Sequence, residues 1–289
     1  MSVKNELRQR FPGLPPTLQQ VARYALDHPN EVVTKSMRTV GVQAGVPPST
    51  LVRFAQQLGF EGWPQFKEAV AQDMGLGSAA YGDKARTLQG RAQDATLVGE
   101  IFQSHRANLE TTERLSGGEL VKAAALLEKA NAVHVAGFRA CFPIAFSLVY
   151  VYRLFRDAVH LVDGQGGSLE MQQRAMRRGD ALVVVSFAPY SREAIQVAEA
   201  GRAAGCKLLA LTDSDASPLS LIADATLLFT TQSPSFFPSV TSGIALAESL
   251  LEMLASRAGK SGVRRIEDAE AELFSTGAYH STGRSRGAS

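Results

Sequence analysis

The sequence has 289 residues, of which 45% are apolar and 20% charged, and its formal net charge is +2. These values are typical of a globular protein long enough for two domains, and a net charge this small does not by itself indicate a nucleic-acid partner. We find no run of eighteen apolar residues and no charged-then-apolar leader, which argues against a membrane span or a secretory signal. We therefore expect a cytoplasmic protein.

The chain has two cysteines, Cys141 and Cys206, and both lie in apolar surroundings. Two are too few for a disulfide framework or a metal cluster, so we expect buried thiols. No Walker sequence and no metal-ligand spacing occurs, and we expect neither a cofactor nor a metal.

The first helix is predicted by the apolar stripe from Leu18 to Leu26 and ends at His28-Pro29. Residues 36–60 then read SMRTVGVQAGVPPSTLVRFAQQLGF. This pattern predicts a short helix, a break at Gly45 and a second helix from Pro48. Because Gly41 is small where two helices must approach and Gly45 suits a turn with positive φ, the spacing indicates a helix-turn-helix.

The second helix of this motif is expected to face the major groove of DNA, where hydroxyl, guanidinium and amide groups meet bases and phosphates. Between Glu31 and Glu61 every charged residue is basic, which favours DNA over the alternative of a plain helical hairpin in an all-α subdomain. The residues expected to contact DNA are Lys35, Arg38, Pro48, Ser49, Thr50, Arg53, Gln56 and Gln57.

We expect the all-α domain to span 1–75, with Trp63 and Phe66 capping its core. Residues 75–90 are rich in Gly, Ala and polar residues and show little periodicity, so we interpret 76–95 as a linker. A long helix is expected over 97–115 and another over 119–129.

From residue 131 to 229, short apolar runs alternate with helical patterns, which predicts an α/β doubly wound parallel sheet. The clearest unit is 179–224, where a strand over 181–185, a helix from Ser191 to Gly205 and a strand over 207–211 form a right-handed βαβ crossover. Other strands are expected at 132–136, 158–161 and 225–229. We expect this domain and its flanking helices to span 96–275, before a disordered tail over 276–289.

Ligands of such sheets bind at the carboxyl ends of the strands, where helix amino termini present free N–H groups. Three polar segments follow strands here: 137–139, 186–191 and the hydroxyl-rich loop 230–242. The residues expected to contact a small effector are Gly137, Arg139, Ser186, Phe187, Tyr190, Ser191, Ser239 and Thr241.

Two segments, GVPPSTLVRFAQQLGFEGWPQFK and GDALVVVSFAPYSREAIQVAEAGRAAGCKLLALTDSDASPLSLIADATL, carry a resemblance that covers nearly the whole chain. The sequence resembles the RpiR family of bacterial transcription regulators, whose second half is a sugar isomerase (SIS) domain. The resemblance implies binding to double-stranded operator DNA as a homodimer or homotetramer. It also implies control of a sugar-related catabolic operon and a response to a phosphorylated sugar or sugar acid held by the SIS loops.

Two departures from the family pattern stand out. Pro47 occupies the position where the family has a Ser N-cap, a cap worth about 1 kcal/mol, although Pro48 is compatible with helix initiation. The phosphate loop, usually Ser-x-Ser-Gly-x-Thr, reads SFAPYS over 186–191. A phosphate could still bind to Ser186, Ser191, the helix amino terminus and Arg139. Alternatively, a less anionic effector would stack on Phe187 and Tyr190.

An isomerase needs a carboxylate base, and Glu170 and Glu193 are available, but neither is distinguished by its spacing from an ordinary helix-surface carboxylate. We interpret His134, in an apolar strand, as a structural histidine. We therefore expect a regulator without catalysis. The alternatives are a sugar-phosphate isomerase or lyase with the same fold and, more weakly, a pure oligomerisation module.

Overall fold

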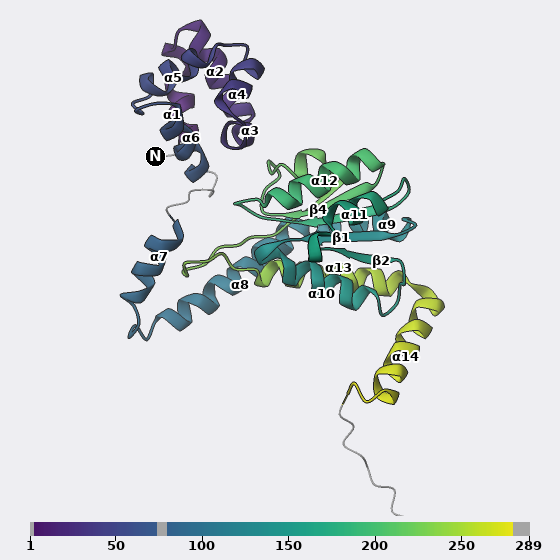
Figure 1. The fold of residues 1–289 in the computed structure, drawn as a ribbon. Helices are drawn as coiled ribbons and strands as arrows, with labels where there is room; N and C mark the ends of the chain where they lie inside the picture. Colours follow the sequence, from purple (N-terminus) through teal and green to yellow (C-terminus); the bar gives the residue numbers. More distant parts are fainter. Residues whose placement is uncertain (1–2, 74–79, 280–289) are drawn as a thin grey trace, which may run out of the picture. The chain divides into compact units, whose positions relative to one another are not determined.

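The fold is described from a computed structural model in which residues 3–73 and 80–279 are described. The chain divides into two compact units, Met1–Asp94 with Ser235–Phe237, and Ala95–Pro234 with Pro238–Ser289 (Figure 1). Within the described ranges no helix is both long and apolar enough to cross a membrane. Most of the predicted disordered tail, residues 280–289, lies outside the described residues.

The first unit is helical, as predicted. Its helices are α1 (Val3–Arg10), α2 (Pro16–Asp27), α3 (Pro29–Thr34), α4 (Met37–Gln43), α5 (Pro48–Gln57) and α6 (Trp63–Asp73). The ring of Phe66 is fully buried, meets Phe54 edge to face at 5.3 Å and lies 5.2 Å from the ring of Trp63. The expectation that Trp63 and Phe66 belong to the core of this unit is confirmed.

The segment interpreted as a linker contains a further helix, α7 (Ala80–Gln89). Its Tyr81 ring lies 5.3 Å from the ring of Phe237. Helices α1 and α3 were also not predicted, because neither segment shows an extended apolar stripe.

The second unit contains a parallel sheet, which confirms the doubly wound prediction. Its strands are β1 (Val133–Gly137), β2 (Val159–Val162), β3 (Ala181–Val185), β4 (Lys207–Thr212) and β5 (Ala225–Leu228), in the order β2-β1-β3-β4-β5. Val135 pairs with Val183 across β1 and β3, and Val183 with Leu209 across β3 and β4. The predicted strands agree with these bounds to within one residue.

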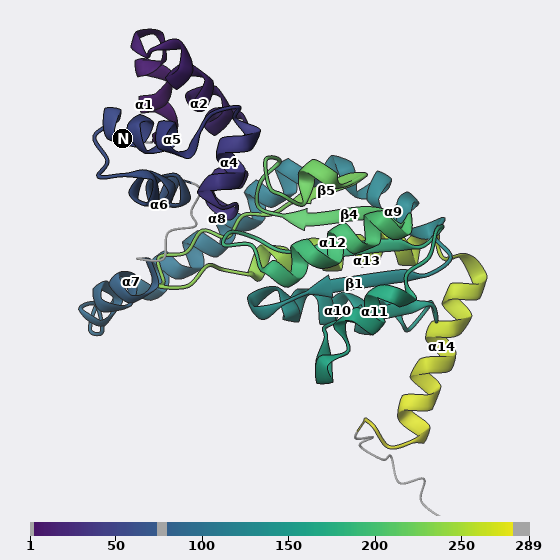
Figure 2. The same cartoon turned by 45° about the horizontal axis from the view of Figure 1, so that its top comes forward.

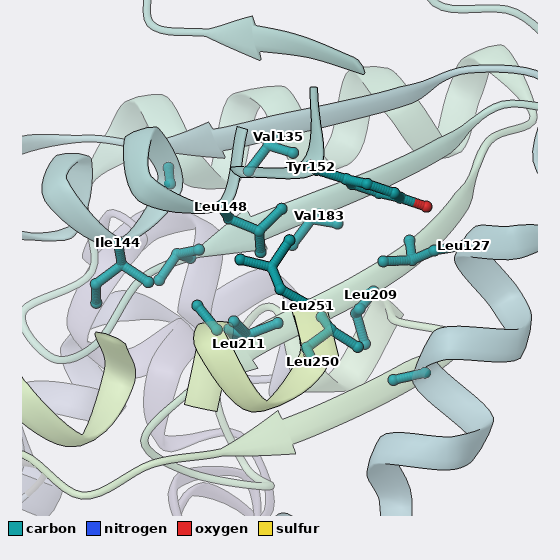
Figure 3. Packing of buried hydrophobic residues seen from close by; sticks show 14 of the residues in the cluster. Leu127, Val135, Ile144, Leu148, Tyr152, Val183, Leu209, Leu211, Leu250 and Leu251 are labelled. Carbon is teal, nitrogen blue, oxygen red and sulfur yellow. The ribbon is translucent and has the colours of Figure 1, made fainter. Parts of the chain in front are cut away.

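Helices cover both faces of this sheet (Figure 2). One face packs against α9 (Leu120–Glu128), α10 (Phe142–Tyr152) and α13 (Thr241–Arg257), and the other against α11 (Leu169–Ala175) and α12 (Arg192–Ala204). Figure 3 shows Ile144, Leu148 and Tyr152 of α10 and Leu250 and Leu251 of α13 against Val135, Val183, Leu209 and Leu211 of the sheet. Cys141 and Cys206 are both buried free thiols, as expected.

Two further helices belong to this unit. Helix α8 (Leu97–Ser116) is attached to the end of β5 by buried polar side chains: the Ser116 hydroxyl donates to the Leu228 carbonyl at 2.8 Å and accepts from the Leu228 N–H at 2.6 Å. Helix α14 spans Gly259–Ser275 and, among its residues, only Gly262 is buried.

Candidate functional site

The helix-turn-helix forms as the sequence predicts. Helix α4 begins at the N-cap Ser36, whose hydroxyl accepts from the Thr39 N–H, and the turn passes through Gly45 with φ +69. A Cβ on Gly41 would lie 2.8 Å from the Val46 carbonyl oxygen, so α4 can approach the start of α5 only because residue 41 is glycine. Leu51 and Phe54, with Val46, are buried between the helices.

The outer face of α5 presents the side chains that the sequence assigns to DNA. Thr50 is half-buried, and the exposed residues of this face are Pro48, Ser49, Arg53, Gln56 and Gln57. The helix begins after Pro47 with no side-chain cap and with Pro48 in its first turn, as the sequence predicts. This face offers a guanidinium, two amides and two hydroxyls to base edges and phosphates.

The basic residues around α4 differ in their partners. The Lys35 ammonium forms an ion pair with Glu31 at 2.7 Å, and the Lys67 ammonium donates to the Lys35 carbonyl at 3.2 Å. Hydrogen bonds from Lys35 and from the Tyr24 hydroxyl hold the pKa of Glu31 below its usual range. Within the described part of the chain, Arg38 and Arg53 have no ion pair. The sequence analysis did not place Lys67 near this basic segment, because Lys67 lies far from Lys35 along the chain.

The first effector segment follows β1. A Cβ on Gly137 would lie 2.6 Å from the Cys141 carbonyl oxygen and 2.7 Å from the Ala145 Cβ, so glycine is needed for close packing there. Arg139 adopts a left-handed φ of 54 and its guanidinium pairs at 3.0 Å with Glu193 in the first turn of α12. The end of β1 and the amino terminus of α12 therefore lie together, as expected for one site.

The serine hydroxyls of the loop after β3 accept hydrogen bonds from backbone N–H groups of the loop and of α12. Ser191 is the N-cap of α12, because its Oγ accepts from the Ala194 N–H at 3.1 Å. Ser186 is buried, and its Oγ accepts from the Ser191 N–H at 3.4 Å. Both serines thus lie between the end of β3 and the start of α12, and both are already hydrogen-bonded within the chain.

The two aromatic residues of this loop point in different directions. Phe187 is 5% exposed and meets Phe229 edge to face, so the expected stacking surface at Phe187 is a wrong prediction. The cause is that Phe187, two residues after the end of β3, lies on the same face of the sheet as Val183 and Val185 and joins their core cluster. The hydroxyl of the half-buried Tyr190 donates to the Asp213 Oδ1 at 2.9 Å. Burial, followed by the charge of Asp213, raises the pKa of Tyr190.

Asp213 is a site residue that sequence reasoning missed. It follows β4 directly, and its Oδ2 accepts from the Ala188 N–H at 3.2 Å. A signal was present, because the carboxyl ends of β3 and β4 meet at one edge of a parallel sheet.

The third segment is attached to α8. The hydroxyl of Ser239, which is 8% exposed, lies 3.2 Å from both the His105 Nδ1 and the Thr241 Oγ1. In the described ranges no hydrogen bond joins Ser239 or Thr241 to the loop 186–191. The structure therefore brings Arg139, Ser186, Tyr190 and Ser191 together and links Ser239 and Thr241 to α8 instead.

The candidate bases have ordinary structural surroundings. Glu170 is exposed in the first turn of α11. The carboxylate of Glu193 accepts from its own backbone N–H and from Arg139, and these contacts lower its pKa. His134 is buried, with its Nε2 3.2 Å from the Asp180 Oδ2, as expected of a structural histidine. The described His, Cys, Asp and Glu residues form no group of three that could hold a metal.

Comparison with known proteins covers both units. Residues 1–76 match the family model of the helix-turn-helix domain of the rpiR family, and residues 126–257 match that of the SIS domain. The HTH-type transcriptional regulator HexR of Pseudomonas aeruginosa is 27% identical over 221 residues, which are 74% of either chain.

Two solved structures share the fold. The sugar isomerase domain of an RpiR transcription factor from Sphaerobacter thermophilus has a TM-score of 0.58 at 23% identity and covers 61% of this chain and 99% of its own. The Vibrio vulnificus NanR protein, complexed with ManNAc-6P, has a TM-score of 0.60 at 18% identity and covers 96% of this chain and 99% of its own. At these identities the likeness concerns the fold.

Proposed function

Since the chain belongs to the RpiR family of transcription regulators with a SIS domain, we propose that it binds operator DNA with an affinity that a small carbohydrate-derived effector changes. The genes it controls are proposed to serve the uptake or breakdown of a sugar or a related compound. The single observation that carries the proposal is the exposed face of α5, with Arg53 at its centre. The opposite face of this helix is buried in the hydrophobic core of the first unit.

Reading of DNA is assigned to α5 and its basic surroundings. Arg53, Gln56 and Gln57 suit base edges, because guanidinium and amide groups form paired hydrogen bonds with purines in the major groove. Arg38 and the first-turn residues Ser49 and Thr50 suit phosphates, which fix the position of the protein without reading sequence. Lys35 has a smaller role, since its ammonium is paired with Glu31.

Effector binding is assigned to the loops at the ends of β1, β3 and β4. A ligand there would contact Arg139, Tyr190 and Asp213, which come from three separate elements. Binding that draws these loops together would change the arrangement of SIS domains in an oligomer and so the spacing of two recognition helices. Coupling of this kind is worth about 1 to 3 kcal/mol, so we expect a graded change in DNA affinity.

A second copy of the chain is the proposed partner of the SIS domain. Along α10, the rings of Phe142, Phe146 and Tyr150 stack at 5.8 Å and 6.4 Å and are 38%, 50% and 52% exposed. Helix α14 adds the exposed Val263 and Phe274. With aromatic side chains of roughly 200 Å² each, these residues expose on the order of 400 Å² of apolar surface, about half of what one partner buries in a standard interface.

The proposed DNA contact is tested by fluorescence anisotropy on labelled DNA from upstream of the protein's own gene and its neighbours. Arg53→Ala should weaken binding by about fivefold or more, because one arginine contact to a guanine is worth about 1 to 3 kcal/mol. Arg8→Ala is the matched control, since it removes the same charge from the exposed face of α1. Equal affinities for Arg53→Ala and the wild type would refute the proposed reading helix.

A further inference from the structure

The loops at the carboxyl ends of β1, β3 and β4 contain donors that an anionic ligand could use. Carboxylates of the protein already accept hydrogen bonds from some of these donors. The strand order reverses between β1 and β3, and ligands of open parallel sheets bind in the crevice at such a reversal. A phosphate bound there would use backbone N–H groups of the loop after β3, the amino terminus of α12 and a nearby cation.

One backbone donor of the loop, the Ala188 N–H, is bound by Asp213. Its Oδ2 accepts from the Ala188 N–H at 3.2 Å, and its Oδ1 accepts from the Tyr190 hydroxyl at 2.9 Å and from the Thr212 hydroxyl at 3.3 Å. The next residue, Pro189, has no N–H to offer. The carboxylate thus occupies the loop in the manner of a bound anion.

Two N–H groups at the amino terminus of α12 are also bound by side chains of the protein. The Glu193 carboxylate accepts from its own backbone N–H, and the Ser191 hydroxyl accepts from the Ala194 N–H at 3.1 Å. The nearby cation, Arg139, is paired with Glu193 at 3.0 Å. A phosphate would therefore have to displace the chain's own acceptors from these donors.

The charges of these loops are balanced before any ligand arrives. Within the described segments 137–141, 186–193 and 212–213, the cations are Arg139 and Arg192, and the carboxylates are Glu193 and Asp213. The net charge of these segments is therefore zero: Arg139 is paired with Glu193, and the exposed Arg192 is the one cation of these described segments without an ion pair. One acceptor does remain, because the Glu193 Oε2 is a buried oxygen with no hydrogen-bond partner among the described residues.

We propose that the effector of this regulator carries no phosphate group and is an unphosphorylated sugar or polyol, whose hydroxyls donate to the carboxylates of Asp213 and Glu193. This inference rests on the proposed effector site. It departs from the phosphorylated effector that the family resemblance implies, because the phosphate of such a compound would compete with the Asp213 carboxylate for the Ala188 N–H and would be repelled by the charge of that carboxylate. ManNAc-6P is the ligand in the Vibrio vulnificus NanR structure and is not a ligand assigned to this protein.

The test is isothermal titration of the full chain with glucose, glucose 6-phosphate and inorganic phosphate, for the wild type and for Asp213→Asn. The wild type should bind neither of the two phosphate compounds with measurable heat at millimolar concentration. Asp213→Asn should gain about tenfold or more in affinity for both, because one repelling charge is removed. Asp215→Asn is the matched control: it neutralises an exposed carboxylate two residues away and should bind like the wild type.

A second variant keeps the test decisive if Asp213→Asn does not fold. Glu193→Gln neutralises the other carboxylate and releases Arg139, so it should also gain phosphate affinity. The inference is overturned if the wild type binds glucose 6-phosphate about tenfold more tightly than glucose, or if neither variant gains affinity while both keep the wild-type circular dichroism. DNA affinity without effector is measured in parallel; its loss in Arg53→Ala tests the regulator itself, so the two failures are distinguishable.

Discussion

Replacement of Gly41 by alanine tests the helix-turn-helix geometry directly. The new Cβ would lie 2.8 Å from the Val46 carbonyl oxygen, 3.5 Å from the Pro48 nitrogen and 3.7 Å from the Leu51 Cδ1. The nearest atom belongs to the backbone of the turn, so the turn itself must shift. Overpacking of this kind costs about 1 to 3 kcal/mol, and the better helix propensity of alanine returns up to about 1 kcal/mol. We expect a net loss of roughly 1 to 2 kcal/mol.

The assay is urea unfolding followed by tryptophan fluorescence. Trp63 is the sole tryptophan of the chain and is 2% exposed in the core of the first unit, so its emission reports unfolding of that unit alone. With a slope of about 1 kcal/mol per molar urea for a domain of this size, the midpoint of Gly41→Ala should fall by roughly 1 to 2 M. Operator affinity should fall with it.

The matched control is Val42→Ala in the same helix. Val42 is 77% exposed, so trimming its side chain should leave the midpoint of the fluorescence transition nearly unchanged. A Gly41→Ala midpoint equal to or above that of the wild type would refute the close approach of α4 to the start of α5.

Two further predictions concern acid stability and assembly. Because the pKa of Glu31 is lowered on folding from its usual value of 4.5, its contribution is present above that value and is lost as the pH falls through the folded pKa. At pH 7 the Glu31→Gln variant should therefore be less stable than the wild type by under about 1 kcal/mol, since the group is partly exposed. In acid the two proteins should have the same free energy of unfolding, and a difference that persists there would contradict this. Replacing both Phe146 and Tyr150 by serine should shift the sedimentation equilibrium toward monomer. The control Phe102→Ser changes a similarly exposed ring on α8 and should not shift it. A double variant that assembles like the wild type would place the interface elsewhere.

The central strands of the second unit could be predicted closely because every residue of β1 and of β3 is buried. The run over 181–185 is apolar throughout, and each of its residues is buried, so the pattern and the structure carry the same information. The linker segment shows the opposite case. Residues 80–89 form a helix, yet they lack an apolar stripe, and Tyr81 packs on Phe237, a residue more than 150 positions away in the chain.

The candidate site was predictable in its location but not in its hydrogen bonds. The bounds of β3 and the N-cap at Ser191 follow from local patterns. Whether a side chain of the loop faces inward or outward depends on how the backbone leaves the strand, and this decides that Phe187 is buried while Tyr190 reaches Asp213. The carboxylate of Asp213 could be assigned a role only once its hydrogen bonds with the Ala188 N–H and the Tyr190 hydroxyl were known.

The measurement that tests the central claim most directly is the affinity of the full chain for its upstream DNA, with and without a panel of sugars, polyols and their phosphates. We predict tight binding that weakens steeply with salt, as expected from release of phosphate counterions, and a shift by about fivefold or more with one unphosphorylated compound. Binding to upstream fragments no tighter than to random DNA, with no compound shifting it, would contradict the account.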